Sequence, residues 1–185
     1  MTSNDGARAL KGKVALVTGA GRGLGRAFAE KLAAMGVDVA IHGMRENGPA
    51  EYGEGSTLTA VAEDVAKAHD VRTIRVLGDL TQSAAIARVV ETTTRELGPI
   101  DILVHNAGGD IAAKGGKPDP NDAIGIKEED VRAVLDRNLL STILTCQAVA
   151  QEMMKRRQGR IVTMAQWRPS RAAPTVRSTP SPRPA

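Results

Sequence analysis

Short apolar runs alternate along this chain with longer stretches in which apolar residues recur at helical spacing. The apolar runs predict strands at residues 14–17, 37–41, 73–77, 100–104 and 160–164. The stretches between them predict helices over residues 24–35, 58–68, 83–97 and 127–157. Strands that alternate with helices favour a parallel sheet covered on both faces. The pattern therefore predicts an α/β fold with a doubly wound parallel sheet of about five strands.

Two predicted loops and the end of the chain lack this periodicity. Residues 47–56 are polar and glycine-rich, and residues 108–125 are rich in Gly, Pro, Lys and Asp. Long loops in α/β domains commonly serve a site, although a plain surface excursion is the alternative. Residues 167–185 contain five Pro and four Arg, a composition that buries little apolar surface. We expect a folded domain over residues 1–166 and a disordered tail over residues 167–185.

The charge of the chain is concentrated in that tail. The sequence has 25 basic and 21 acidic side chains, which gives a formal net charge of +4. Four arginines follow Gln166 with no acid among them, so 21 basic side chains balance 21 acidic ones in the domain. A neutral domain does not predict nucleic-acid binding, and the tail alone is a weak candidate for it.

The hydropathy and the cysteine content of the chain bear on its location and on disulfide or metal sites. The N-terminal ten residues contain polar and charged side chains where a signal peptide needs an apolar run, and no apolar stretch is long enough to span a bilayer. We therefore expect a cytoplasmic protein with no membrane partner. Cys146 is the only cysteine, so we expect a buried, reduced thiol and no metal site.

A glycine-rich stretch follows the first predicted strand and opens the first predicted helix. It is Thr18-Gly19-Ala20-Gly21-Arg22-Gly23-Leu24-Gly25. Glycines let the backbone approach a pyrophosphate, and the amides and dipole of a helix N-terminus favour its negative charge. A turn built only for tight packing of strand against helix is the alternative. The stretch predicts a dinucleotide site formed by Thr18, Gly19, Arg22, Gly23, Leu24 and Gly25.

The spacing of this stretch is T-G-x-x-x-G-x-G, which resembles the glycine motif of the short-chain dehydrogenase/reductase family. The resemblance covers roughly residues 11–165. It implies a Rossmann-like fold and an NAD(P)-dependent oxidoreductase, similar to 3-oxoacyl-thioester reductases and related carbonyl reductases. The implied substrate is a small carbonyl compound or alcohol.

Two further motifs follow the third and fourth predicted strands. Asp79, followed by Leu80, stands where the family binds the adenine amino group, although an N-cap of the next helix is the alternative. Asn106-Ala107-Gly108 matches the family motif that packs the sheet and lines the adenosine pocket. His105 replaces a usual Asn, and we interpret it as a satisfied core or strand-end histidine.

Asn138 matches the asparagine of the family's catalytic tetrad. In the family this residue lies at an irregularity of the long helix, where a main-chain carbonyl holds a water of the proton relay. A merely solvated Asn on a helix is the alternative.

The end of the second predicted strand bears on the choice of cofactor. An acid there would bind the ribose of NAD and repel the phosphate of NADP, and none occurs before Glu46. Arg22 and Arg45 are suited to a 2′-phosphate, unless both are ordinary surface residues. We expect NADP as the cofactor, with NAD possible.

The resemblance fails after Ala165. The family continues with a Ser and then a helix that carries Tyr-x-x-x-Lys, which supply the proton and hold the nicotinamide ribose. Here Gln166 follows instead, the only tyrosine is Tyr52, and no lysine follows Lys155. We expect a catalytically incomplete chain, and the second hypothesis is a dinucleotide-binding pseudoenzyme or fragment without turnover.

By the family's spacing the Tyr and Lys fall near Thr179 and Arg183. The genetic code permits codons for residues 177–184 that encode Tyr-x-x-x-Lys when read one nucleotide earlier. We hypothesise a frameshift near codons 164 to 166, with a natural truncation and new tail as the alternative.

The family is homo-oligomeric, and part of its interface lies in the segment that has no match here. Strand five should then be an open edge. Four apolar residues should lose their cover and lower the solubility of the chain: Leu139, Ile143, Leu144 and Val149.

Overall fold

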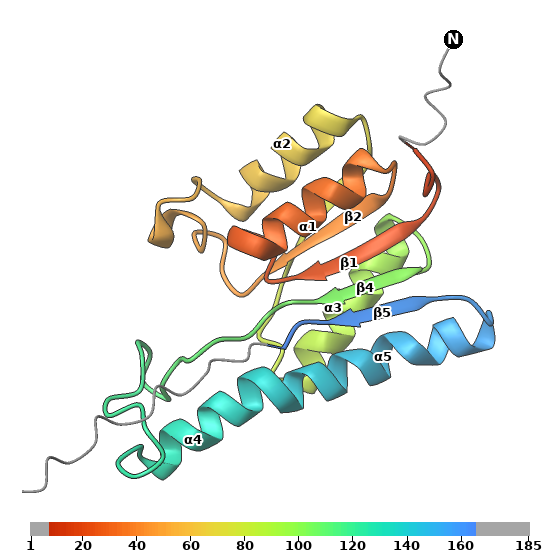
Figure 1. Cartoon of the computed structure of the whole chain (residues 1–185). Helices are drawn as coiled ribbons and strands as arrows, with labels where there is room; N and C mark the ends of the chain where they lie inside the picture. Colours follow the sequence, from red (N-terminus) through yellow and green to blue (C-terminus); the bar gives the residue numbers. More distant parts are fainter. Residues whose placement is uncertain (1–7, 166–185) are drawn as a thin grey trace, which may run out of the picture.

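A computed structural model describes residues 8–165, and they form a five-stranded parallel sheet with helices on both faces (Figure 1). The sheet order is β3-β2-β1-β4-β5. The strands are β1 Val14–Thr18, β2 Asp38–Gly43, β3 Thr73–Leu77, β4 Ile102–His105 and β5 Arg160–Thr163. The predicted doubly wound, Rossmann-like α/β architecture is therefore confirmed. The predicted tail, residues 167–185, lies outside the described residues.

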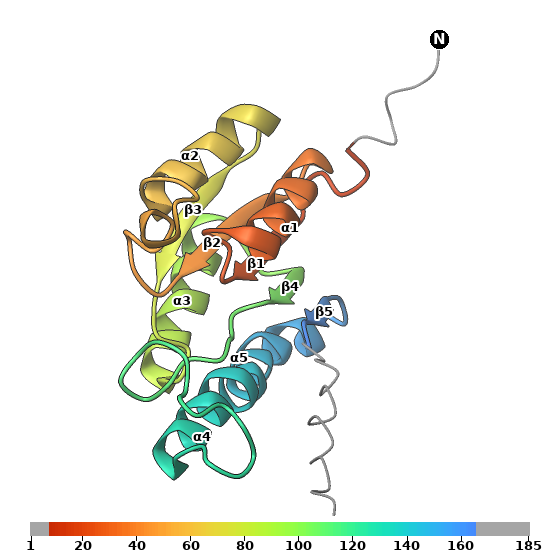
Figure 2. The same cartoon turned by 60° about the vertical axis from the view of Figure 1, so that its left-hand side comes forward.

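The helices divide between the two faces of the sheet (Figures 1 and 2). One face carries α1 Gly23–Ala34 and α2 Leu58–His69. The other carries α3 Ser83–Glu96 and the long helix, which consists of α4 Glu128–Leu135, a π-helical turn Asp136–Leu140 and α5 Ser141–Lys155. The predicted bounds agree with these elements to within about two residues.

The core lies on both faces of β1, and every residue of this strand is buried. Ala15 and Val17 pack with α1 and α2, whereas Val14 and Leu16 pack with α3 and α5. Adjacent side chains of a strand point to opposite faces, so a fully apolar run is required when both faces are covered. Full burial of a Val or Leu side chain in this strand contributes about 1.5–3 kcal/mol.

The two helices on the first face begin in different ways. At α2, the hydroxyl of the N-cap Thr57 accepts a hydrogen bond from the amide of Ala60 at 3.0 Å. At α1, the N-cap Arg22 makes no side-chain capping bond. The first amides of α1 are therefore left for partners from elsewhere in the molecule.

The edge at β5 and the outer face of the long helix expose apolar surface. β5 is the last strand of the sheet in the described residues, and Ile161 and Val162 are 39% and 48% exposed, as expected for an open edge. Leu139 and Ile143 are 56% and 45% exposed. Val149 contradicts the expectation, because it is buried against the sheet beside Met153.

Cys146 is free but only partly buried, so the expectation of a buried thiol is correct in part. Burial raises the pKa of its thiol. Within residues 8–165, no helix has both the length and the apolar character needed to cross a membrane.

Candidate functional site

The predicted site residues lie at one edge of the sheet, where the carboxyl ends of the parallel strands meet. The glycine-rich turn follows β1, Arg45 follows β2, Asp79 and Leu80 follow β3, and Asn106 to Gly108 follow β4. From β1 the strand order runs to β2 on one side and to β4 on the other. Open α/β sheets bind ligands at such a switch point, outside the carboxyl ends of the strands.

Thr18 joins the ends of the two central strands. It is fully buried, and its hydroxyl oxygen accepts hydrogen bonds from the amides of Asn106 and Ala107, both at 3.0 Å. Asn106 also donates from its side-chain nitrogen to the carbonyl of Gly19 at 3.4 Å. These bonds fix the glycine-rich turn against the segment that follows β4.

Two glycines of the turn are required by close packing. A Cβ at Gly25 would overlap the carbonyl oxygen of Gly19 and lie 2.7 Å from the side-chain nitrogen of Asn106. Gly19 has a φ of +65°, and a Cβ there would lie 3.1 Å from Cα of Ala107. The packing alternative for the glycine motif thus accounts for these two positions, since Gly25 brings α1 against the turn and Gly19 brings the turn against the segment after β4.

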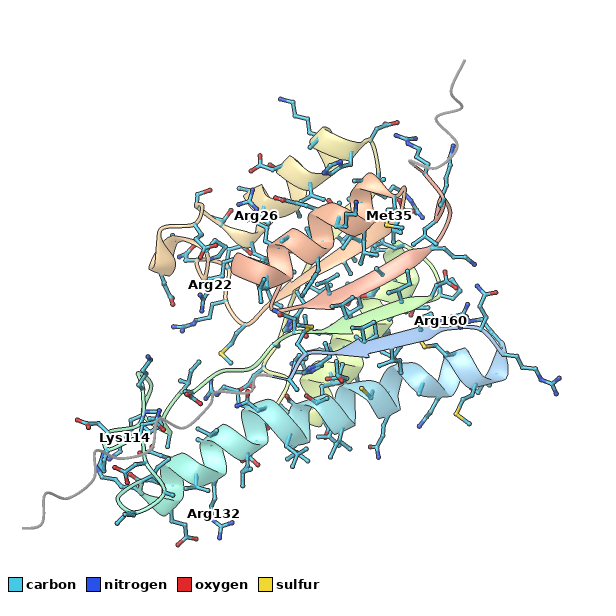
Figure 3. All side chains as sticks on the ribbon, viewed as in Figure 1. Arg22, Arg26, Met35, Lys114, Arg132 and Arg160 are labelled. Atoms are coloured by element: carbon cyan, nitrogen blue, oxygen red, sulfur yellow. The ribbon has the colours of Figure 1, made fainter. Side chains whose placement is uncertain are left out.

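Gly23 and Leu24, in contrast, are exposed at the start of α1, and Leu24 is 65% exposed. The Gly23 amide donates a hydrogen bond of 2.7 Å to Oε2 of Glu54. A carboxylate oxygen therefore already lies where the helix dipole and the free amides favour an anion. Arg22 lies beside them at the beginning of α1 (Figure 3).

His42, near the end of β2, lies beneath this turn and is 2% exposed. Its Nδ1 accepts from the amide of Gly19 at 3.3 Å, and its Nε2 lies 3.0 Å from the carbonyl oxygen of Gly78. This pair of bonds requires a neutral ring with the proton on Nε2. Burial lowers the pKa of His42 to about 4, against the opposing effect of the Gly78 carbonyl. Sequence reasoning missed this role, for which a polar residue near the end of a buried strand was the available signal.

The segment after β2 carries the residues that bear on cofactor choice. Arg45 is 66% exposed and forms an ion pair of 3.3 Å with Glu51. Glu46 accepts a hydrogen bond of 2.9 Å from the amide of Thr59 and pairs with Arg75 at 3.2 Å. The bonds from Thr59, followed by the charge of Arg75, hold the pKa of Glu46 below its usual value. The first acid after β2 is thus bound to the start of α2.

Asp79 is partly buried after β3 and does not cap the next helix. Its Oδ1 accepts from the amide and the hydroxyl of Thr81, at 3.0 and 2.9 Å. The N-cap of α3 is Gln82, so the N-cap alternative for Asp79 is wrong. Leu80 is buried, 5% exposed.

Asn138 lies in the π-helical turn of the long helix, and an irregularity is therefore present where the family resemblance implies one. Its Oδ1 accepts from the Gly109 amide at 2.8 Å, and its Nδ2 donates to the carbonyls of Gly109 and Val134, at 3.0 and 2.8 Å. A Cβ at Gly108 would lie 2.5 Å from Oδ1 of Asn138. These bonds exclude the alternative of a merely solvated side chain.

The main-chain carbonyl of Asn138 is linked to the buried end of β4. Thr142 donates its hydroxyl to this carbonyl at 2.7 Å and lies 3.2 Å from Nδ1 of His105. His105 is 1% exposed, as expected for a core position, and burial lowers its pKa to about 4. Its Nε2 has no hydrogen-bond partner among the described residues, so the expectation of a satisfied histidine is only half correct.

The loop after β4 lies against the start of α4, with Lys114 and Arg132 at this end of the molecule (Figure 3). Buried Asp130 of α4 holds the loop, because its Oδ1 accepts from the amide of Ala113 at 2.9 Å. No local sequence pattern predicts this contact, because it depends on the path of the loop. In the described part of the chain, no group of three or more His, Cys, Asp or Glu side chains is arranged to hold a metal ion.

Comparison with known proteins agrees with this geometry. A model of the short chain dehydrogenase family matches residues 13–168. The chain is 38% identical over 157 residues to cyclohexanol dehydrogenase of Rhodococcus sp. (strain TK6), which covers 84% of this chain and 57% of that protein. It is 36% identical over 154 residues to 3-oxoacyl-(acyl-carrier-protein) reductase FabG of Escherichia coli (strain K12), covering 83% of this chain and 54% of that protein.

The FabG reductase of Aquifex aeolicus (strain VF5) is likewise 36% identical over 158 residues, covering 84% of this chain and 56% of the relative. The chain thus spans about half the length of the curated relatives it matches. The family match includes the sheet from β1 to β5 and the glycine-rich turn that opens α1. The chain therefore belongs to the short chain dehydrogenase family of oxidoreductases.

Proposed function

We propose that this chain binds NADP, with the pyrophosphate at the start of α1. The observation that carries the proposal is the exposed Gly23 amide, which already donates to a carboxylate oxygen at 2.7 Å. The amides of Gly23 and Leu24 would hold the pyrophosphate, in a turn whose glycines leave no room for side chains at Gly19 and Gly25. The remaining cofactor contacts would come from Thr18, Arg22, Arg45, Asp79, Leu80, Asn106, Ala107 and Gly108.

The preference for NADP over NAD rests on the end of β2. This strand ends at Gly43, and no acid precedes Glu46, whose carboxylate is bound to Thr59 and Arg75. The carboxylate of Glu46 is therefore not available to bind the ribose hydroxyls or to repel a 2′-phosphate. Arg22 and Arg45 would supply the guanidinium groups that bind such a phosphate well.

A bound nicotinamide would exchange a hydride with a small carbonyl compound or alcohol. The names of the relatives indicate two classes, cyclic alcohols and 3-oxoacyl thioesters, and we favour the second because FabG reductases recur among the relatives. Asn138 would act through its main-chain carbonyl, which the hydroxyl of Thr142 also contacts. We further propose that the protein acts in the cytoplasm and that it assembles as a homo-oligomer.

Gln166 stands where the family has the Ser that orients the substrate, and the Tyr-x-x-x-Lys that supplies the proton in the family does not occur in residues 1–185. We therefore propose that it binds the dinucleotide without turnover. The test is a fluorescence titration of the purified chain with NADPH and with NADH, together with an assay of 3-oxoacyl-thioester and cyclohexanone reduction. We expect NADPH to bind more tightly than NADH and no reduction to occur. A folded chain, judged by circular dichroism, that binds neither dinucleotide would refute the proposal.

The sequence after Gln166 carries a proposal of its own, and these residues lie outside the described part of the chain. We propose a single-nucleotide frameshift near codons 164 to 166, because the expected Tyr and Lys fall at Thr179 and Arg183. The match to the family model ends at residue 168, which supports a change of frame in this region. Nucleotide sequencing of the locus tests the idea. It fails if no shift by one nucleotide restores Tyr-x-x-x-Lys and an open frame beyond it.

A further inference from the structure

The segment between β2 and α2 covers the glycine-rich turn. Pro49 and Leu58 pack over Gly21, where a Cβ would lie 3.2 Å from Pro49 and 3.0 Å from Leu58. Glu54 accepts the hydrogen bond from the Gly23 amide through its side chain. We call residues 49–56 the acidic segment, after its two glutamates.

The second glutamate of the acidic segment contacts the other group that the proposed function assigns to a phosphate. Glu51 pairs with Arg45 at 3.3 Å, and the side chains are 39% and 66% exposed. Glu54 therefore lies at the pyrophosphate position, while Glu51 lies at the guanidinium assigned to the 2′-phosphate. Two carboxylates on one short segment thus contact the two groups that the proposed function assigns to the phosphates of NADP.

We propose that the acidic segment is an internal competitor of the dinucleotide, and that its displacement sets both affinity and the choice between NADP and NAD. The inference rests on the proposed function, because it assigns the same amide and the same guanidinium to phosphates. Binding of the pyrophosphate must break the bond between Glu54 and Gly23. Binding of the 2′-phosphate must in addition break the pair between Glu51 and Arg45.

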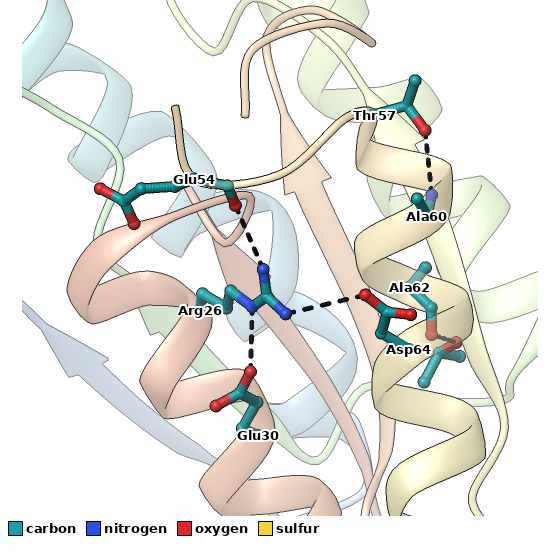
Figure 4. A network of polar contacts seen from close by, with 8 residues as sticks. Arg26, Glu30, Glu54, Thr57, Ala60, Ala62 and Asp64 are labelled. Atoms are coloured by element: carbon teal, nitrogen blue, oxygen red, sulfur yellow. Dashed lines mark hydrogen bonds and ion pairs between the residues drawn. The ribbon is translucent and has the colours of Figure 1, made fainter. Parts of the chain in front are cut away.

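The contacts of Arg26 hold the acidic segment in this position (Figure 4). Arg26 of α1 donates from Nη1 to the main-chain carbonyl of Glu54 at 3.2 Å. The same guanidinium is fixed by Glu30 at 2.9 Å and lies 3.8 Å from Asp64 of α2. The carbonyl bond does not involve the carboxylate of Glu54, so substitution of that side chain leaves it in place.

The backbone around Glu54 suits a segment that moves without disturbing the helices. Gly53 and Gly55 flank Glu54 with φ of +69° and +142°, conformations that favour glycine and allow the chain to reverse direction sharply. The hydroxyl of Thr57 caps α2 through its bond to Ala60. Displacement of residues 49–56 therefore leaves the start of α2 intact.

The two glutamates are expected to act differently on the two cofactors. NAD has the pyrophosphate but no 2′-phosphate, so it competes with Glu54 alone, whereas NADP competes with both glutamates. Glu54→Gln should tighten binding of NADH and NADPH alike, by roughly fivefold for an exposed charge-assisted bond. Glu51→Gln should tighten NADPH alone, by about twofold to threefold, because both partners of its ion pair are exposed.

The experiment titrates the full chain and its variants with NADPH and NADH in 0.15 M salt, with circular dichroism as the check on folding. Glu91→Gln, at an exposed position of α3, is the matched control for loss of one negative charge, and it should change neither affinity. The selective effect of Glu51→Gln on NADPH, beside the unselective effect of Glu54→Gln, is the expected result. If Glu91→Gln tightened dinucleotide binding as much as the other two variants, the inference would be overturned, since the effect would then be one of net charge.

The outcomes separate failure of this inference from failure of the proposed function. If the unsubstituted chain binds NADPH and both variants bind it no more tightly, the acidic segment is not a competitor, while the proposed function stands. If no variant binds either dinucleotide, the proposed function fails and the inference fails with it. A readout without ligand is the amide proton resonance of Gly23, which should shift upfield in Glu54→Gln. An unchanged resonance would also overturn the inference.

Discussion

The Nε2 of His42 and the main-chain oxygen of Gly78 lie 3.0 Å apart and join β2 to the segment that follows β3. The other ring nitrogen holds the amide of Gly19, so one imidazole supports both the glycine-rich turn and the segment that carries Asp79. Protonation of Nδ1 would convert the acceptor for Gly19 into a second donor. The neutral ring is therefore part of the folded structure.

This requirement predicts loss of stability in mild acid. The pKa of His42 is about 4 in the folded chain against an ordinary value of 6.5, so the unfolded chain binds the proton more readily. The stability that neutral His42 contributes is complete above pH 6.5 and is lost as the pH falls from there through about 4. Between these two pH values, the free energy of unfolding should fall by about 1.4 kcal/mol for each unit by which the pH is lowered, for one such histidine. Urea denaturation at a series of pH values measures it.

The check on this assignment is the substitution of His42 itself. His42→Gln should lower the stability at neutral pH and make the dependence on pH shallower. His105, whose pKa burial also lowers to about 4, should supply a residual slope of the same sign. An identical slope in His42→Gln and the unsubstituted chain would contradict the assignment.

The strands could be predicted from the sequence, whereas the contacts of His42 could not. The strands were predictable because a sheet covered on both faces requires continuous apolar runs such as residues 14–17. The contacts of His42 depend on the paths of three segments, after β1, β2 and β3, which no local pattern encodes. Glu54 is a polar residue in a loop, and only the folded path of that loop brings it to Gly23.

A second prediction concerns the glycine-rich turn. Gly25→Ala should destabilise the chain by about 2–3 kcal/mol, since the added methyl group would overlap the carbonyl oxygen of Gly19. It should also abolish dinucleotide binding, because α1 must move away from the sheet. Gly12→Ala is the matched control, with a φ of +82° and no atom within 4 Å of the added Cβ. That variant should lose only about 1 kcal/mol to backbone strain and keep its affinity. Equal stability of the two variants in urea would refute the packing argument.

A third prediction concerns Asp101, which lies at the opposite end of the sheet from the candidate site. It is 9% exposed and accepts from Arg156 at 3.0 Å, from Gln158 at 2.9 Å and from the amide of Val14 at 3.2 Å. Burial opposes its ionisation, but the bonds from Arg156 and Val14 outweigh burial and hold its pKa below the ordinary value. Asp101→Ala leaves three donors without this acceptor. It should lower the free energy of unfolding, measured by urea denaturation, by about 3 kcal/mol.

Asp101→Asn separates charge from shape in the same experiment. The amide keeps one acceptor oxygen but places a donor group near the amide of Val14, so we expect a smaller loss of about 1–2 kcal/mol. Dinucleotide affinity should be unchanged in both variants while they remain folded, because Asp101 precedes β4 and the candidate site follows it. A larger loss in the Asn variant than in the Ala variant would contradict this account.

The apolar outer face of the long helix makes the last prediction, which concerns self-association. Leu139 and Ile143 are four residues apart, so they lie on one side of the helix, and they are 56% and 45% exposed. Exposed apolar surface of this kind promotes association, and we expect the chain to form aggregates or oligomers.

The double substitution Leu139→Lys and Ile143→Lys should shift the chain towards monomer in size-exclusion chromatography with light scattering. The free energy of unfolding should change by less than about 1 kcal/mol, because neither side chain is buried. Gln151→Lys, exposed on the same helix about two turns beyond Ile143, adds charge without removing apolar surface and should leave the association unchanged. A monodisperse monomer of the unsubstituted chain at all concentrations would show that this face does not drive association.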